Sequence, residues 1–238
     1  MRIGIDLQGL QSEGSSSRGI GRYSFEIVRN LIKSSPKDQK RIVFYSEGTN
    51  YWIYFESIIK YLSANRIKIT YLTSDKTDPV LSTNSPYLSS FYIGDGTVRT
   101  ICFATMEAEM VVMTMPDLDN FYIKRSINVK KYIYIHHSIV SQHMIYNEGA
   151  FDKFDTVFCV GKHHVLENTE IEKIKKTSKK ELVEHGYGRL DRLLNELKED
   201  DEIPLDYQSY QDGKINVLLA PSWGPNAILE RLGDVIIE

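Results

Sequence analysis

The chain has 238 residues, of which 42% are hydrophobic and 26% charged, so it carries enough apolar material for a globular core. Its formal net charge of −3 gives no overall attraction to nucleic acid, and we expect no nucleic-acid partner. No apolar run approaches the ~20 residues that cross a bilayer, and no signal peptide precedes the first strand-like segment. We therefore expect a cytoplasmic protein, whose membrane contact would be peripheral on the inner membrane face.

Cysteine usage also suits a reducing compartment. Cys102 and Cys159 both lie inside apolar runs, where free cysteines behave as small buried hydrophobic residues. We expect neither a disulfide between them nor a metal bound to them. The glycine spacing near the N-terminus does not match the dinucleotide-binding fingerprint, and we predict no cofactor.

The first predicted elements are two strand–loop–helix units. Residues 2–7 are expected to form a strand and residues 22–33 a helix, separated by a loop rich in glycine and serine. Glycines in such a loop let the backbone approach a phosphate or a sugar at the N-terminus of the helix. The second unit has a strand at residues 41–45 and a helix at residues 51–65.

Further short apolar runs, bounded by turn residues, are predicted as strands. They cover residues 67–72, 88–93, 100–104, 110–113, 132–135, 156–160 and 182–184. The lysine-rich stretch 170–181 is predicted to form the solvated face of a helix with its following loop. The alternative is that it contacts an anionic membrane. Residues 190–197 are predicted to form a helix. Strands that alternate with helices predict a parallel sheet with helices on both faces, which is a Rossmann-like α/β fold.

The composition changes after this domain. We assign residues 1–197 to one domain and the acidic, polar residues 198–213 to a linker. Residues 214–238 read as one strand and one helix that open a second domain.

Two histidine pairs are the main candidates for chemistry. His136-His137 follows directly after the run 132–135, and His163-His164 comes two residues after the run 156–160; both runs are predicted as strands. Because the carboxyl ends of parallel strands meet at one edge of a sheet, we expect both pairs to face that edge, where ligands bind. Histidine titrates near neutral pH, so His136 or His137 could accept a proton from an attacking hydroxyl. The alternative for each is a structural histidine held by hydrogen bonds.

A carboxylate pair follows another predicted strand. Asp117 and Asp119 come after the run 110–113 and could contribute to a metal site. Such a local pair more often caps a following helix, and we favour capping and predict no metal.

Two resemblances to known families follow from these segments. The opening GIDLQGLQ, followed by SSSRGIGRYSFEIVRNL, resembles the start of nucleotide-sugar glycosyltransferases of GT-B architecture over about the first 34 residues. That segment would add an extra strand–helix unit. From about residue 41 onward the chain is similar to the CDP-glycerol glycerophosphotransferase family of teichoic-acid-type enzymes. This similarity rests on the blocks IVFYSEG, TMPDLDNFYIKRS, YIYIHHSIVSQH, FDTVFCVGKHH, LVEHGYGRLDRLL and INVLLAPSWGPN.

The second resemblance implies a fold, a reaction and a set of residues. It implies that residues 1–197 are the acceptor-side half of a GT-B architecture and that residues 214–238 begin the donor-nucleotide domain. Members of the family attack the β-phosphorus of a CDP-alcohol and release CMP. His137 falls on the position of the histidine that acts on the acceptor hydroxyl, with His136 as the alternative. The residues expected to bind substrate are Gly48, Asp117, Ser138, His163 and Arg189.

The implied partners are CDP-glycerol or a related nucleotide-activated polyol, and a lipid-linked or polymeric acceptor made of polyol phosphate or sugar. A glycosyltransferase that uses a nucleotide sugar is an alternative. A non-catalytic module that only binds the acceptor is another, because most of the donor domain is absent from these 238 residues. For the same reason we expect weak or no CMP release from CDP-glycerol by this chain alone.

Overall fold

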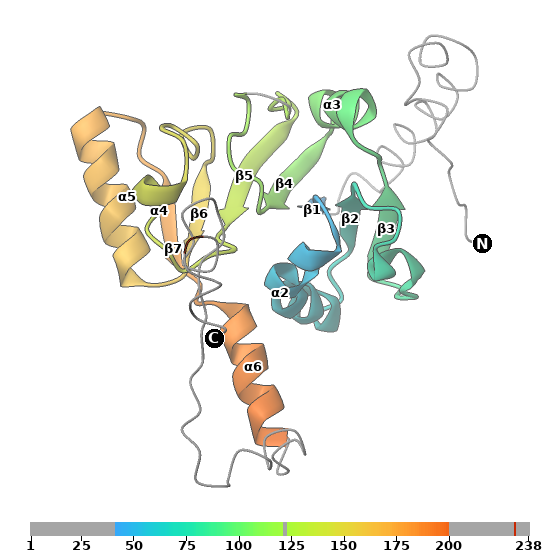
Figure 1. Ribbon diagram of the computed structural model, residues 1–238. Coiled ribbons are helices and arrows are strands. Elements are labelled where there is room, and N and C mark those ends of the chain that lie inside the picture. The colour runs from blue at the N-terminus through green and yellow to red at the C-terminus, as the bar shows by residue number, and fades with distance from the viewer. Residues whose placement is uncertain (1–40, 121–122, 200–230, 232–238) are drawn as a thin grey trace, which may run out of the picture. The chain divides into compact units, whose positions relative to one another are not determined.

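The computed structural model describes residues 41–120, 123–199 and 231. Within these residues, seven strands form one parallel sheet in the order β3-β2-β1-β4-β5-β6-β7 (Figure 1). The strands are β1 (Ile42–Ser46), β2 (Ile69–Thr73), β3 (Leu88–Tyr92), β4 (Ala108–Met113), β5 (Val129–Ile135), β6 (Thr156–Cys159) and β7 (Glu181–Glu184).

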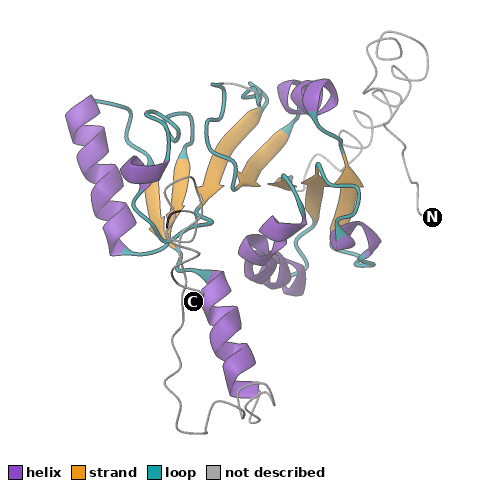
Figure 2. Cartoon of the chain, viewed as in Figure 1, coloured by secondary structure: helices purple, strands orange, loops and turns teal. Residues whose placement is uncertain are grey.

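Helices connect most of these strands (Figure 2). They are α2 (Trp52–Ala64), α3 (Gly96–Thr105), the short α4 (Gln142–Ile145), α5 (Lys162–Lys175) and α6 (Gly188–Glu199), together with the 3-10 helices η2 (Thr49–Tyr51) and η3 (Pro79–Ser82). None of the helices in the described part of the chain is both long enough and apolar enough to cross a membrane.

Both faces of the sheet are buried under helices. Successive side chains of a strand point to opposite faces, so Val43 and Tyr45 of β1 join one core cluster with Phe103 of α3. Phe44 joins the other cluster with Phe55 of α2. In Figure 1, α3 and α2 accordingly lie on opposite sides of the sheet. The predicted Rossmann-like α/β fold is confirmed, and the two buried faces explain why its central strands read as continuous apolar runs.

The strand order reverses between β1 and β4. The chain runs outward from β1 through β2 to β3, then returns to place β4 on the other side of β1, from which β5, β6 and β7 follow outward. In open parallel sheets, ligands bind beyond the carboxyl ends of the strands at such a reversal. The segments after β1, β4 and β5 are therefore the ones that this topology favours for a site.

The strand predicted at residues 100–104 is wrong, because these residues belong to α3. Val98, Cys102 and Phe103 are buried whereas Ile101 is 38% exposed, which is the spacing of one helical face. A short apolar run fits a strand and a buried helical face equally well. Here the residues form a helix because its buried face covers the sheet. The prediction that Cys102 and Cys159 are buried free thiols is confirmed.

The expected helix cap at Asp117 and Asp119 is also wrong. No helix begins between residues 114 and 120 or between 123 and 128, and the two residues have φ of 60° and 65°. Aspartate tolerates this left-handed conformation better than most residues. Asp119 Oδ1 accepts a hydrogen bond from the Arg125 backbone N at 3.3 Å, so the carboxylate closes a loop instead.

Several predictions concern parts of the chain that lie outside the described residues. They are the strand, loop and helix within residues 1–34, most of the linker, and the opening of a second domain at residues 214–238. The chain divides into two compact units, residues 1–192 and 193–238, and α6 runs on to Glu199, beyond the domain end expected at residue 197.

The helix at residues 96–105 can be tested with two substitutions two residues apart. In a strand, Ile101 and Phe103 would share one face, whereas in α3 only Phe103 is fully buried. We expect Phe103→Ala to lower the free energy of unfolding by about 3–5 kcal/mol. Ile101→Ala should lower it by less than about 1 kcal/mol. Urea denaturation followed by circular dichroism measures both, and equal losses would contradict the helix.

Candidate active site

His137 lies at the carboxyl end of β5, surrounded by tyrosines from several elements. Its ring centroid is 5.6 Å from that of Tyr51 and 6.1 Å from those of Tyr54 and Tyr146. The Tyr187 hydroxyl, beyond β7, donates to the His137 carbonyl at 3.1 Å. With Tyr134 of β5, these side chains form what we call the tyrosine cluster: Tyr51, Tyr54, Tyr134, Tyr146 and Tyr187 around His137.

The hydroxyl contacts identify the basic nitrogen of His137. Tyr134 donates to the Tyr146 hydroxyl at 3.4 Å, which uses the single proton of Tyr134. The Tyr134 oxygen then accepts from Nδ1–H of His137, also at 3.4 Å. Tyr146 donates its own proton to His137 Nε2 at 3.4 Å. In this arrangement Nε2 is the unprotonated nitrogen, and its lone pair accepts from the Tyr146 hydroxyl, through which a further proton can reach it.

Burial keeps His137, Tyr134 and Tyr146 neutral at pH 7. It lowers the pKa of His137 below its ordinary value near 6.5, and a hydrogen bond with the main chain of Thr114 offsets part of the effect. Burial likewise raises the pKa of the Tyr134 and Tyr146 hydroxyls above 10. A neutral imidazole among neutral phenols can act as a general base without first losing a proton.

A carboxylate and a guanidinium lie near the cluster. Burial raises the pKa of Glu47, which directly follows β1, and the charge of Arg99 on α3 opposes this shift. Arg99 also donates to the Tyr45 hydroxyl at 3.3 Å. Sequence reasoning missed Glu47, Arg99 and the tyrosines. The rule that selected the histidines, a polar residue directly after a buried strand, applies equally to Glu47 and could have found it.

His136 has a different environment from His137. It is 2% exposed, and its Nε2 accepts a hydrogen bond of 2.7 Å from Gln142. Burial, followed by the neighbouring His164 and His137, lowers its pKa to about 3, so it stays neutral. Because no substrate hydroxyl can approach a ring this deeply buried, the arrangement favours His137 as the base.

The second histidine pair lies beside the first, as the sequence predicted. The rings of His136 and His164 are 4.2 Å apart. His164 is buried and donates from Nε2 to the Val140 carbonyl at 2.9 Å. His163 is exposed, and its Nε2 lies 3.2 Å from the Ile139 carbonyl. Both therefore tie the start of α5 to the segment after β5.

Two of the remaining predicted binding residues lie against the tyrosine cluster. Gly48 has extended backbone, and its carbonyl accepts from the Tyr51 N–H at 3.2 Å. Arg189 is exposed, and a hydrogen bond with the Tyr54 hydroxyl raises its pKa. Of the two, Arg189 has the exposed side chain.

The other two predicted residues hold loops. The Ser138 hydroxyl accepts from the Val140 N–H at 3.3 Å. Asp117 Oδ2 accepts from the Asn147 side chain at 3.5 Å, while its buried Oδ1 has no hydrogen-bond partner. Neither side chain contacts His137 through an interaction seen in this structure.

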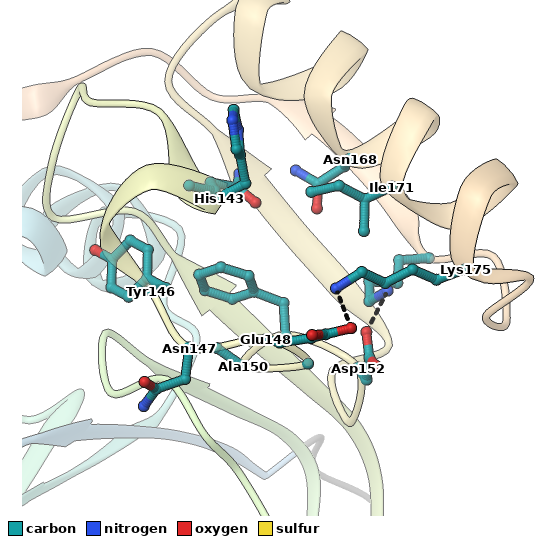
Figure 3. Close-up of a pocket in the computed structure, with 13 residues that line it drawn as sticks. His143, Tyr146, Asn147, Glu148, Ala150, Asp152, Asn168, Ile171 and Lys175 are labelled. Carbon is teal, nitrogen blue, oxygen red and sulfur yellow. Dashed lines mark ion pairs between the residues drawn. The ribbon is translucent and has the colours of Figure 1, made fainter.

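A pocket of about 220 Å³ lies between the segment 142–152 and α5, and we call it the α5 pocket (Figure 3). It shares Tyr146 with the tyrosine cluster. It is lined by Gln142, His143, Tyr146, Asn147, Glu148, Gly149, Ala150, Phe151, Asp152, Asn168, Ile171, Lys175 and Lys180.

The fold and these side chains define a Rossmann-like α/β domain with a candidate histidine base at the carboxyl edge of its sheet. No protein-family model matches the chain, and neither a curated protein nor a solved structure matches it. Among the residues that the structure describes, no group of three or more His, Cys, Asp or Glu side chains could hold a metal ion. The function is therefore argued from the chemistry of the site.

Glu167 of α5 holds the segment that carries Gln142 and Tyr146. Its carboxylate accepts from the backbone N–H groups of Gln142 and His143, at 2.9 and 3.0 Å, and from the Ser141 hydroxyl at 2.6 Å. Burial would raise the pKa of this carboxyl, but these hydrogen bonds and the His143 side chain outweigh burial and lower it to about 2. The carboxylate thus satisfies the first N–H groups of α4 from outside that helix.

The depressed pKa of Glu167 predicts a pH-dependent contribution to stability. Since the folded state holds the carboxylate more strongly than the unfolded chain does, the stabilisation is complete above about pH 4.5 and is lost as the pH falls towards 2. We expect Glu167→Gln to cost about 1–3 kcal/mol at pH 7, the scale of hydrogen bonds to charged groups. Urea unfolding of both proteins from pH 7 to 3 measures the difference. A difference that does not shrink below pH 4.5 would contradict this role.

Proposed function

We propose that this chain is the acceptor-side part of a transferase that moves a polyol phosphate from CDP-glycerol, or from a related nucleotide-activated polyol, to an acceptor hydroxyl. The observation that supports the proposal is His137, a neutral, partly buried imidazole at the carboxyl edge of β5 whose unprotonated Nε2 contacts the Tyr146 hydroxyl. Attack by a hydroxyl on phosphorus needs such a base together with accurate positioning.

The chemistry assigns a role to each group. Nε2 of His137 takes the proton of the acceptor hydroxyl, directly or through the Tyr146 hydroxyl that touches it. The hydroxyl oxygen then forms a bond to the β-phosphorus, and the bond from that phosphorus to CMP breaks. The exposed guanidinium of Arg189 lies beside the same cluster and is suited to bind phosphate oxygens.

The proposed acceptor is a lipid-linked or polymeric molecule built of polyol phosphate or sugar, used at the cytoplasmic face of the membrane. The proposed base and acceptor-binding groups belong to the residues that the structure describes. A peripheral membrane contact would bring the enzyme to a lipid-linked acceptor.

The choice of donor can be measured by the nucleotide that is released. The longest chain that the gene encodes is incubated with an acceptor extract and either CDP-glycerol or UDP-sugars. Release of CMP with transfer of glycerol phosphate supports the proposal. Release of UDP alone would instead make the protein a glycosyltransferase, and acceptor binding without release of either nucleotide would make it a binding module.

Substitution of His137 tests the base. We expect His137→Gln to lower kcat by ~10²-fold while the thermal unfolding temperature changes little, because the ring is only partly buried. His163→Gln tests whether the second histidine pair carries the base instead, since His163 follows the neighbouring strand and bonds a loop carbonyl. A rate loss of this size in His163→Gln but not in His137→Gln would remove His137 from the mechanism.

The pH profile gives a second readout of the same base. Because burial lowers the pKa of His137, the neutral form persists below pH 6.5, and kcat/KM should stay level from pH 7.5 down past 6.5 before it falls. His137→Gln should remove this fall of kcat/KM at low pH.

A further inference from the structure

The α5 pocket has an internal balance of charge. Lys175 Nζ lies 2.9 Å from Glu148, and Lys180 Nζ lies 3.6 Å from Asp152 and 3.7 Å from Glu172. Figure 3 shows the Lys175 side chain pointing towards the Glu148 carboxylate. Because each lysine ammonium group is already paired with a carboxylate, the pocket has no strong electrostatic attraction for an anion or a cation. It presents hydrogen-bond donors and acceptors side by side.

One buried group in this pocket lacks a partner. Gln142 is 1% exposed, and its Nε2 donates to His136, but its Oε1 has no hydrogen-bond partner. A buried acceptor without a partner is destabilising relative to one that is paired. Gln142 is also one of the residues that line the pocket.

Part of the lining is apolar. Ala150, Phe151 and Ile171 line the pocket together with Tyr146. The volume of about 220 Å³ is below the ~300–1,000 Å³ of sites for drug-sized ligands. Each hydroxyl of a sugar ring or short polyol both donates and accepts, and its C–H groups pack on apolar side chains. The size, balanced charge and mixed lining therefore match a single hydroxyl-rich unit.

We propose that the α5 pocket is a subsite that binds one sugar or polyol unit of the acceptor. The proposal rests on the function proposed above, and it adds where and how the acceptor is recognised. Tyr146 belongs both to this pocket and to the tyrosine cluster, where its hydroxyl contacts His137 Nε2. A unit bound in the pocket is thus next to the side chain that touches the base, and the adjoining unit of the acceptor supplies the reacting hydroxyl.

Direct binding tests the subsite without any donor nucleotide. The 238-residue chain is titrated with glycerol, D-glucose and N-acetyl-D-glucosamine, and saturation-transfer NMR detects binding. We expect at least one of these probes to bind and to shift the side-chain amide resonances of Gln142 and Asn168, which both line the pocket. Binding of none of the three, or binding that leaves both amide resonances in place, would overturn the proposal.

A matched pair of variants on α5 tests the location. Ile171 lines the pocket, whereas Ile174, three residues further along the same helix, is 76% exposed and is not part of the lining. Ile171→Trp should weaken binding of the probe by at least ~5-fold, and Ile174→Trp should leave it unchanged. Should Ile171→Trp fail to fold, the amide shifts in the unsubstituted chain still decide the question.

The two proposals can fail separately. His137→Gln should bind the probes normally, because the pocket does not include His137. If the chain binds a probe but releases neither CMP nor UDP, the subsite proposal stands and the transferase proposal fails. If the chain releases CMP and Ile171→Trp does not raise the KM for the acceptor, the transferase proposal stands and the subsite proposal fails.

Discussion

Burial of β5 on both faces determines the direction of every side chain at its carboxyl end. Tyr132 and Tyr134 face one core cluster, and Ile133 and Ile135 face the other. A shift of the strand by one residue would exchange these faces, so the register is strongly specified. His136 continues the tyrosine face and becomes buried. His137, the next residue along the chain, is only partly buried, and its ring contacts the hydroxyls of Tyr134 and Tyr146.

The segment after β5 is held in place mainly by α5. Its carbonyl groups at Ile139 and Val140 accept from His163 and His164, and the N–H groups at the start of α4 donate to Glu167. These contacts form one hydrogen-bonded unit between two neighbouring strand ends. They position Tyr146 and Gln142, so the same support serves the tyrosine cluster and the α5 pocket.

Burial separates the roles of adjacent histidines. Both have lowered pKa values, because low-dielectric surroundings disfavour the charged imidazolium. The His136 ring is almost fully enclosed, and its Nε2 already accepts from Gln142. Its role is therefore structural. In His137 the ring is partly open and bordered by hydroxyl groups that can exchange protons with it.

The sequence alone determined the parallel α/β sheet, most of its strands and the position of the histidine pairs at strand ends. Those features depend on local apolar runs and the turns that bound them, which can be read in a single segment. The run at residues 100–104 misled because it is short enough to fit either a strand or a buried helical face. Only the tertiary structure could bring Tyr51, Tyr54 and Tyr187 to His137, since they come from distant parts of the chain. Only packing, likewise, could decide which histidine of a pair is buried, because burial depends on the side chains that surround a residue and not on the residue itself.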